Sequence, residues 1–371
     1  MLRFKNGHFK IMQIADTQES TKISPDTLNL ISAVLDREQP DFVVFSGDQV
    51  KGYSAAVKRG GNVCVEQMIN KLTEPIVSRD IPFSVTFGNH DTQSGVGKQE
   101  QMSIYEKAGT FTKGNRHSEE DVGTSSFVVF SENGEKEVFQ LLLIDSQGSL
   151  DLGGYKPVTP EQIEWYRSMR DGALKRNGEY LPALVIQHIP VPEFYDTLVK
   201  VPKGTKGAVQ AFRTHKNEYY VLPDHALENG GFMHESPAIP DENTGEFKAM
   251  CECGDVMGIF VGHDHINSYV TKLNGVDLGY TQGCGFNVYG PGRKRGVRIF
   301  DFCEENPREY KTYTVTSEDI GQVLHGSDVF RKVMDSMPTS AEQVKPLIKG
   351  ACIAAGVSAA AGIVYAIKRR K

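Results

Sequence analysis

Residues 9–18 read FKIMQIADTQ, a short apolar run that ends in Asp16 and Gln18. The same pattern returns at residues 41–48, DFVVFSGD, and at residues 83–91, FSVTFGNHD. Short runs rich in valine, isoleucine and phenylalanine predict buried strands. Helical patterns separate these runs, so the order of elements predicts an α/β fold with a mostly parallel sheet in its first part.

Helices and later strands continue this alternation. A helix is predicted over residues 25–39, where Pro25 stands in the first turn and apolar residues recur at helical spacing. Further helices are predicted over residues 63–77 and from 160 to about 170. Additional strands are expected at residues 126–130, 139–144, 181–187, 256–261, 276–282 and 295–302. Residues 191–247 are polar and rich in glycine, proline and asparagine, and they predict loops beside a site.

The charge of the chain argues against a nucleic-acid partner. The net charge is -6, and the last four residues are all basic. Of the 41 basic residues, 37 therefore lie in residues 1–367, against 47 acidic ones, and this body carries -10. An acidic surface binds a phosphate backbone poorly. The six scattered cysteines indicate free thiols in a reducing compartment.

The two ends of the chain suggest its location. Residues 1–10 contain no apolar signal-peptide core, so we expect the catalytic body to be cytoplasmic. Residues 350–367 form an uninterrupted apolar run, followed by Lys368, Arg369, Arg370 and Lys371. Such a helix spans about 27 Å, close to the hydrocarbon thickness of a bilayer. We therefore expect a catalytic domain over residues 1–312, a helical linker over 313–349 and a hydrophobic C-terminal helix over 350–371 that anchors the protein in a membrane. A peripheral or buried helix is the alternative for this tail.

Metal-seeking side chains follow the predicted strands in five blocks. Their carboxylate, amide and imidazole groups are Asp16, Gln18, Asp48, Asn89, His188, His263 and His265. Any one of them alone would more often be structural. Together they form a mixed set of ligands that suits Mn, Fe or Zn better than Ca or Mg.

The spacing at the last block favours two ions. His263 and His265 are two residues apart at a strand end, so in extended backbone they point to opposite sides and each can address a different ion. Two ions about 3.5–4 Å apart, bridged by a carboxylate and a hydroxide, form a clamp for in-line attack on phosphorus.

The order Asp-x-Gln, Gly-Asp, Gly-Asn-His-Asp, His and Gly-His-x-His resembles the calcineurin-like metallophosphoesterase superfamily, from about Lys10 to Tyr269. The surroundings of His188 and His263 are similar to the branch related to purple acid phosphatases. This resemblance implies a four-layer α/β/β/α sandwich of the metallophosphoesterase type. It also implies that one ion is held by Asp16, Gln18, Asp48 and His265, and the other by Asp48, Asn89, His188 and His263.

The resemblance further gives His90 the role of general acid, hydrogen-bonded to Asp91, outside the metals. A carboxylate behind an imidazole would fix its tautomer and favour its protonated form. Glycines 47, 88 and 262 would let the backbone approach the metals without a Cβ clash.

Two positions depart from the family pattern. Gln18 stands where most members have histidine, and its amide oxygen is a weaker ligand that binds directly or through water. Lys51 stands where purple acid phosphatases carry the tyrosine that colours their iron, and Tyr53 falls two residues too late. We therefore predict a colourless enzyme.

The sequence thus predicts a metal-dependent hydrolase that cleaves a phosphomonoester or a small phosphodiester, with no nucleic acid as partner. A nuclease of the same superfamily is one alternative, disfavoured by the charge of the body. A non-catalytic binding or regulatory homologue is the other, because Gln18 weakens one metal contact. The pair His90-Asp91 argues for catalysis, since pure binding needs no general acid.

Overall fold

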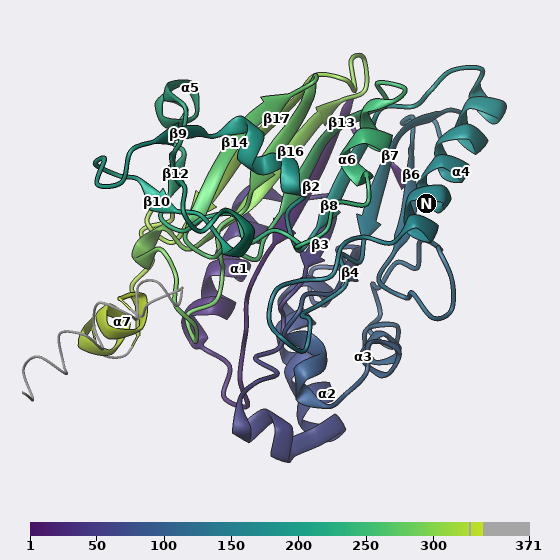
Figure 1. The fold of residues 1–371 in the computed structure, drawn as a ribbon. Coiled ribbons are helices and arrows are strands. Elements are labelled where there is room, and N and C mark those ends of the chain that lie inside the picture. The colour runs from purple at the N-terminus through teal and green to yellow at the C-terminus, as the bar shows by residue number, and fades with distance from the viewer. Residues whose placement is uncertain (326–327, 337–371) are drawn as a thin grey trace, which may run out of the picture. The chain divides into compact units, whose positions relative to one another are not determined.

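The computed structural model describes residues 1–325 and 328–336. Two β-sheets pack face to face in it (Figure 1). The smaller sheet has the strand order β17-β16-β2-β3-β4. The strands β2, β3 and β4 run parallel, and β16 and β17 join them antiparallel. Their bounds are β2 His8–Ile14, β3 Phe42–Ser46, β4 Phe83–Thr86, β16 Gly296–Cys303 and β17 Tyr310–Thr316.

The larger sheet has the order β1-β6-β7-β8-β13-β15-β14-β12, with β5 beside β6. Its central strands β7, β8, β13 and β15 are parallel neighbours. The bounds are β1 Leu2–Arg3, β5 Asn115–Arg116, β6 Ser125–Phe130, β7 Glu137–Ile144, β8 Ala183–Gln187, β12 Phe232–Met233, β13 Val256–Val261, β14 Asn267–Leu273 and β15 Val276–Tyr280.

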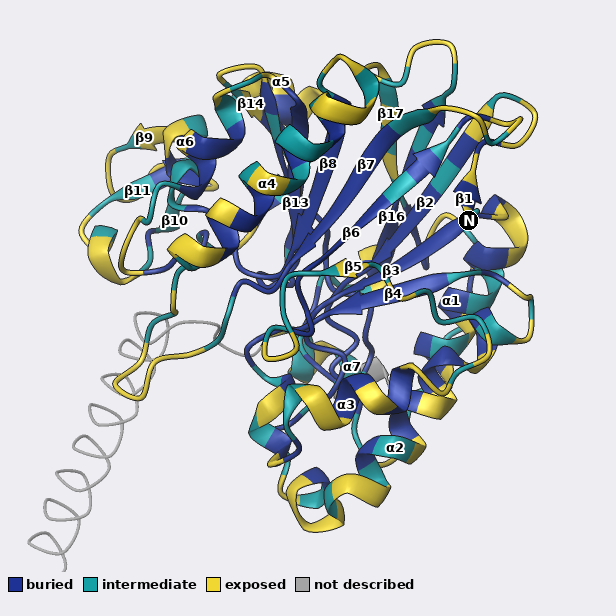
Figure 2. Cartoon of the chain, turned by 90° about the vertical axis from the view of Figure 1, so that its right-hand side faces the viewer, coloured by how far each residue is buried: buried dark blue, intermediate teal, exposed yellow. Residues whose placement is uncertain are grey.

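Helices cover the outer faces of the two sheets (Figure 2). The α-helices are α1 Pro25–Glu38, α2 Ala55–Val77, α3 Lys98–Tyr105, α4 Pro160–Asn177, α5 Asp224–Glu228, α6 Glu246–Cys251 and α7 Asp328–Asp335. Short 3-10 turns are η1 Asp91–Ser94, η2 Pro192–Thr197, η3 Arg213–His215 and η4 Gly292–Lys294. Their exposed residues face outward and their buried ones face a sheet, as expected for amphipathic helices.

The hydrophobic cores define the layers. Within the described residues, one core joins the smaller sheet to α1, α2 and α3, and another joins the larger sheet to α4 and α6. A third core lies between the sheets and is rich in phenylalanine. The rings of Phe139 and Phe302 are stacked there with their centroids 4.5 Å apart. Three such interfaces require four layers, so the predicted α/β/β/α arrangement is confirmed in the described part of the chain.

Most predicted elements lie where the periodicity placed them, but two expectations need correction. The predicted helix over 63–77 is the second half of α2, which begins at Ala55 and bends at Gly61, where φ is 55°. Residues 191–247 are not loops alone. They form a small sheet of order β10-β11-β9 and bury aromatic side chains such as Phe194 and Tyr220 in the core of the larger sheet. Its bounds are β9 Val199–Val201, β10 Val209–Gln210 and β11 Tyr219–Val221.

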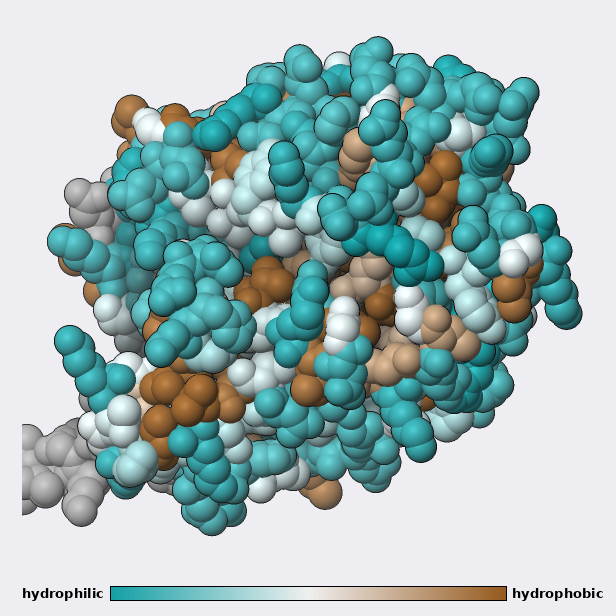
Figure 3. Space-filling model, turned by 90° about the horizontal axis from the view of Figure 1, so that it is seen from above, coloured by the Kyte–Doolittle hydropathy of each residue, from teal (hydrophilic) through white to brown (hydrophobic). Residues whose placement is uncertain are grey.

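The expected domain boundary at residue 312 falls inside β17, whose last residues 313–316 are strand and not helical linker. The first compact unit runs from Met1 to Asp335. The predicted membrane helix over 350–371, with most of the linker, lies outside the described residues. No helix in the described ranges is long and apolar enough to cross a bilayer. On the face shown in Figure 3, hydrophilic side chains predominate and hydrophobic ones form small separate groups.

Candidate metal centre

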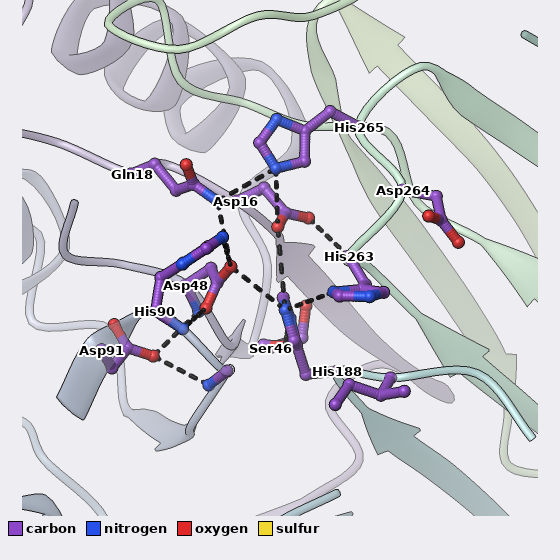
Figure 4. Close-up of polar contacts among 12 residues, drawn as sticks. Asp16, Gln18, Ser46, Asp48, His90, Asp91, His188, His263, Asp264 and His265 are labelled. Atoms are coloured by element: carbon purple, nitrogen blue, oxygen red, sulfur yellow. Dashed lines mark hydrogen bonds and ion pairs between the residues drawn. The ribbon is translucent and has the colours of Figure 1, made fainter. Parts of the chain in front are cut away.

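The loops that follow the central strands bring the predicted ligands to one place (Figure 4). Asp16 and Gln18 follow β2, Asp48 follows β3 and Asn89 follows β4. From the larger sheet, His188 follows β8, and His263 and His265 follow β13. Both sheets therefore contribute, and parallel strands deliver their carboxyl ends to a shared edge.

The first predicted ligand set is compact. Asp16 Oδ1 lies 3.3 Å from His265 Nε2. The Gln18 side-chain nitrogen lies 2.9 Å from Asp48 Oδ2 and 3.1 Å from His265 Nε2. The amide thus already reaches the two neighbours with which it would share an ion. Turning the amide over would place its oxygen at this position, since the two ends of an amide occupy nearly the same space.

The second predicted set shares Asp48. His188 Nε2 lies 3.3 Å from Asp48 Oδ2, and His263 Nδ1 lies 3.3 Å from His188 Nε2. The ligand atoms of these three residues all lie within 4.8 Å of one another, and all three residues are buried. Asn89 is also buried, and the backbone N–H of the next residue, His90, donates to Asp48 Oδ1 at 2.8 Å.

Two buried oxygens in this cluster show that a cation fits there. Asp16 Oδ1 and Asn89 Oδ1 have no hydrogen-bond partner, although native proteins leave few buried polar atoms unpaired. Both belong to predicted ligands, one from each set. Carboxylate, amide and imidazole groups that converge on one point are the arrangement that a divalent metal stabilises.

The three glycines of the motifs are required because a side chain there would clash. A Cβ on Gly88 would lie 2.1 Å from Asp48 Oδ1, and one on Gly47 would lie 2.5 Å from His188 Nδ1. On Gly262 it would lie 2.6 Å from Asp16 Oδ2. These distances confirm that glycine lets the backbone approach the ligand side chains.

Carboxylates and imidazoles in this buried cluster shift one another's pKa. Burial alone would raise the pKa of Asp48, but the imidazoles of His188 and His90 hold it well below its usual value. Burial alone would lower the pKa of His188, yet Asp48 and Asp16 raise it to about 9. The pKa of His263 lies well below its usual value because of burial and the nearby His188. His263 is therefore neutral and ready to bind a metal, whereas His188 must first lose a proton.

The structure contradicts the predicted hydrogen bond between His90 and Asp91. The Asp91 carboxylate is fully buried and accepts hydrogen bonds from the backbone N–H groups of Asp48, Val50 and Gly88 at 2.8–2.9 Å. The partner of His90 is Gln93, whose Oε1 lies 2.9 Å from His90 Nδ1. Asp91 is turned toward the backbone because three N–H donors satisfy a buried carboxylate better than one imidazole would.

Sequence patterns alone did not single out several residues that support the ligands. His188 donates from Nδ1 to the carbonyl oxygen of Ser46 at 3.1 Å, and His265 donates from Nδ1 to that of Tyr289 at 3.0 Å. The ring of Tyr289 also stacks on His265 at 4.2 Å. Such bonds fix which ring nitrogen faces a metal. Because they use backbone carbonyls, side-chain identity carries no signal for them.

Tyr53 occupies the edge of the centre, although it is misplaced for the role of an iron ligand. Its hydroxyl donates to Gln18 Oε1 at 3.1 Å, and its ring packs edge-on against His90 at 4.8 Å. Burial and the charge of Asp48 raise the pKa of Tyr53 to about 12. Tyr53 therefore stays a neutral phenol that positions Gln18.

The segment after residue 148 forms another part of the rim. Tyr155 packs edge-on against His263 at 4.4 Å and stacks on Phe212 at 5.7 Å. Arg213 is bound by Asp241 at 2.7 Å and lies against Gly154. This confirms part of the expectation that residues 191–247 border the site, with an aromatic wall beside one ligand set.

Parallel strands from two packed sheets that deliver such a mixed ligand set to one edge are typical of dimetal phosphoesterases. The sequence model of the calcineurin-like phosphoesterase family matches residues 9–267, and the chain belongs to this family.

Curated relatives agree with the family. The chain is 27% identical over 347 residues to a probable inactive purple acid phosphatase 14 of Arabidopsis thaliana, covering 81% of this chain and 77% of that protein. It is 28% identical over 337 residues to the probable inactive purple acid phosphatase 29 of the same plant, covering 80% and 78%. The phosphatase DCR2 of Saccharomyces cerevisiae is 26% identical over 291 residues, which are 72% of this chain and 45% of that protein.

Solved structures show the same fold. A dimetal phosphatase from Danio rerio superposes with a TM-score of 0.52 at 12% identity, covering 83% of this chain and 99% of the other. At such low identity the likeness concerns the fold alone.

We predict that metal affinity rises with pH because His188 must release its proton. With a pKa of about 9, His188 is protonated at pH 7 and competes with the metal. Affinity should therefore increase by about tenfold per pH unit for one displaced proton and level off above pH 9. Calorimetric titration with Mn²⁺ in buffers of different ionisation enthalpy measures both the affinity and the protons released. Equal affinity at pH 7 and pH 9 would contradict this assignment.

We also predict that Tyr53→Phe weakens one of two metal-binding events. Once the Gln18 amide is turned over so that its oxygen faces the ion, its NH2 group takes the place beside Tyr53 and donates to the hydroxyl. Loss of the hydroxyl removes this supporting hydrogen bond, which costs about tenfold in affinity. Calorimetry with Mn²⁺ should show one weakened site and one unchanged site. Tyr219→Phe, on β11, is the matched control and should bind both ions like the native chain. If both sites of Tyr53→Phe keep native affinity, Tyr53 does not position Gln18.

Proposed function

We propose that this protein is an active metallophosphoesterase that hydrolyses a phosphomonoester or a small phosphodiester with two divalent ions. Asp16, Gln18 and His265 would hold one ion, Asn89, His188 and His263 the other, and Asp48 would serve both. Ions of this class supply Lewis-acid activation of the phosphoester and of the attacking water. Manganese, iron and zinc all suit the donor set.

The position of His90 is the observation that carries the proposal. The His90 side chain is 29% exposed, whereas the predicted ligands are buried. His90 can therefore contact a substrate that binds to the metals from the solvent side. Gln93 Oε1 accepts a hydrogen bond from His90 Nδ1–H, which leaves Nε2 on the side of the centre, 3.9 Å from Asp48 Oδ2. A protonated Nε2 there can donate to the departing oxygen of the ester.

The relatives named probable inactive make a non-catalytic role the second candidate. One observation favours it: the amide nitrogen of Gln18, and not its oxygen, points toward Asp48 and His265. The loss of the predicted His90-Asp91 bond also removes one argument for catalysis. Catalysis remains our proposal because His90 is held by Gln93 at the open side of the centre, a position that metal binding alone does not require.

The expectation of a small substrate rests on charge and on the rim. The net charge of -10 in residues 1–367 disfavours a nuclease. Tyr155 and Phe212 form an aromatic wall next to His263, which suits the organic part of a small ester.

We predict hydrolysis of a small chromogenic ester by the full-length protein loaded with Mn²⁺. The assay compares a phosphomonoester, a phosphodiester and single-stranded DNA, and metal content is measured in the same samples. Turnover of one or both small esters, and little of the DNA, is expected. Two bound metals without turnover of either small ester would refute the proposal and favour the non-catalytic role.

We further predict that His90→Ala and Asp48→Asn fail in different ways. Because His90 is not a predicted ligand, His90→Ala should keep both metals and lose turnover by about 100-fold or more. Asp48→Asn should lose metal itself, since the shared carboxylate contacts both sets. Metal analysis and turnover are measured together, with His117→Ala as a matched histidine control that pairs with Asp121. Equal metal loss in both variants would contradict these roles.

A further inference from the structure

A cavity lies away from the metal centre, between strands that belong to different sheets. It has a volume of about 710 Å³ and is lined by residues of β14 and β17 and by the turn after α5. None of the predicted metal ligands lines it. Its polar lining includes Ser268, Thr271, Lys272, Arg298, Thr312 and Thr314. The volume is in the range of small-molecule sites, which are about 300–1,000 Å³.

Arg298 is the unusual member of this lining. Its side chain is only 3% exposed, yet its guanidinium binds neutral groups. Nε donates to Thr281 Oγ1 at 3.2 Å, Nη1 to Thr312 Oγ1 at 3.1 Å, and Nη2 to the carbonyl oxygen of Tyr280 at 2.8 Å and weakly to Ser268 Oγ at 3.4 Å. Its guanidinium lies over the ring of Phe260 at 5.5 Å and makes no ion pair with a carboxylate of the described residues, and burial lowers its pKa to about 10.

Other buried arginines of the described chain have acidic partners. Arg295 lies 2.6 Å from Asp335, and Arg170 lies 2.9 Å from Asp171. A buried cation without a counter-charge is costly, because the protein does not replace the water that it loses. Among the described residues, Arg298 therefore stands out as a buried positive charge that only neutral groups bind.

The acidic groups at this cavity are already engaged. Asp277 pairs with Lys272 at 3.1 Å and accepts from the hydroxyl of Tyr310 at 2.8 Å. Asp319 accepts from the backbone N–H and the hydroxyl of Thr316 at 2.9 and 2.7 Å. Neither carboxylate therefore contacts Arg298, whose guanidinium is bound by neutral groups of the lining and of β15, and an oxyanion is the ligand that would complement it.

We propose that this cavity binds a small oxyanion, either inorganic phosphate or the phosphate group of a larger molecule, on Arg298. Ser268 and Thr312 accept hydrogen bonds from the guanidinium and keep their own O–H groups to donate to the anion. A guanidinium with flanking hydroxyls is well suited to a tetrahedral oxyanion. The site is separate from the metal centre and does not depend on the proposed hydrolysis.

The test is calorimetric titration of the full-length protein with inorganic phosphate, in EDTA so that no metal competes for the anion. Native protein should bind phosphate, whereas Arg298→Met should bind at least about tenfold more weakly. Arg176→Met, an exposed arginine on α4, controls for loss of charge and should bind like the native chain. Titration with glycerol phosphate in parallel distinguishes a free anion from a phosphate-bearing molecule by which of the two binds more tightly.

Equal phosphate affinity in native protein and Arg298→Met, or no binding by the native protein, would overturn the proposal. If Arg298→Met does not fold, Thr312→Val removes only a hydroxyl from the same cavity and should still weaken phosphate binding. Native affinity in Thr312→Val would then count against the site.

Discussion

The buried carboxylate of Asp91 holds the centre of the molecule together. It accepts backbone hydrogen bonds from Asp48, Val50 and Gly88, and so ties the loop after β3 to the loop after β4. Burial and the charge of Asp48 raise the pKa of Asp91 to about 7, so these bonds gain strength from its charge as the carboxylate ionises above that pH. The backbone of His90 in turn fixes the Asp48 carboxylate. Both predicted ligand sets share Asp48, so the geometry of each depends on a residue that touches no predicted ligand atom.

The backbone of several predicted ligands is strained, and the hydrogen bonds of Asp91 help to hold it. Asp16, Gln18, Asp48 and His263 all have positive φ, between 34° and 73°. Residues with a side chain rarely adopt this left-handed conformation, which costs on the order of 1–3 kcal/mol each. Local hydrogen bonds offset this cost. Asp16 Oδ2 accepts from the backbone N–H of His263, and the backbone N–H of Gln18 donates to the carbonyl oxygen of Asp48. The loops are thus held in conformations that they would not adopt alone, with their ligands converging.

The sequence predicted which distant side chains the structure brings together, but not the groups that hold them in place, for a physical reason. A ligand must be a particular side chain at the end of a strand, and such a position can be recognised from neighbouring residues alone. This is the case for Asp48, His188 and His263. The partner of His90 was mispredicted because Asp91 is adjacent in sequence, while the N–H groups that bind Asp91 include two from the loop after β3. The strands β14 and β17 were not predicted. Each lies near an edge of its sheet and mixes polar with apolar residues, so neither shows the continuous apolar run of a buried strand.

One chain of hydrogen bonds joins features that no local pattern connects. Arg298 donates to Thr281, whose hydroxyl donates to Gln13 Oε1 at 2.8 Å. Gln13 then donates to Ser46 Oγ at 3.0 Å, and the carbonyl oxygen of Ser46 accepts from His188. Gln13, Ser46 and Thr281 are fully buried, so each must satisfy its polar atoms within the protein. Because a buried polar network loses more than one bond when a member is removed, Arg298, Thr281, Gln13 and the Ser46 hydroxyl together tie the two sheets at the residue whose carbonyl oxygen accepts from His188.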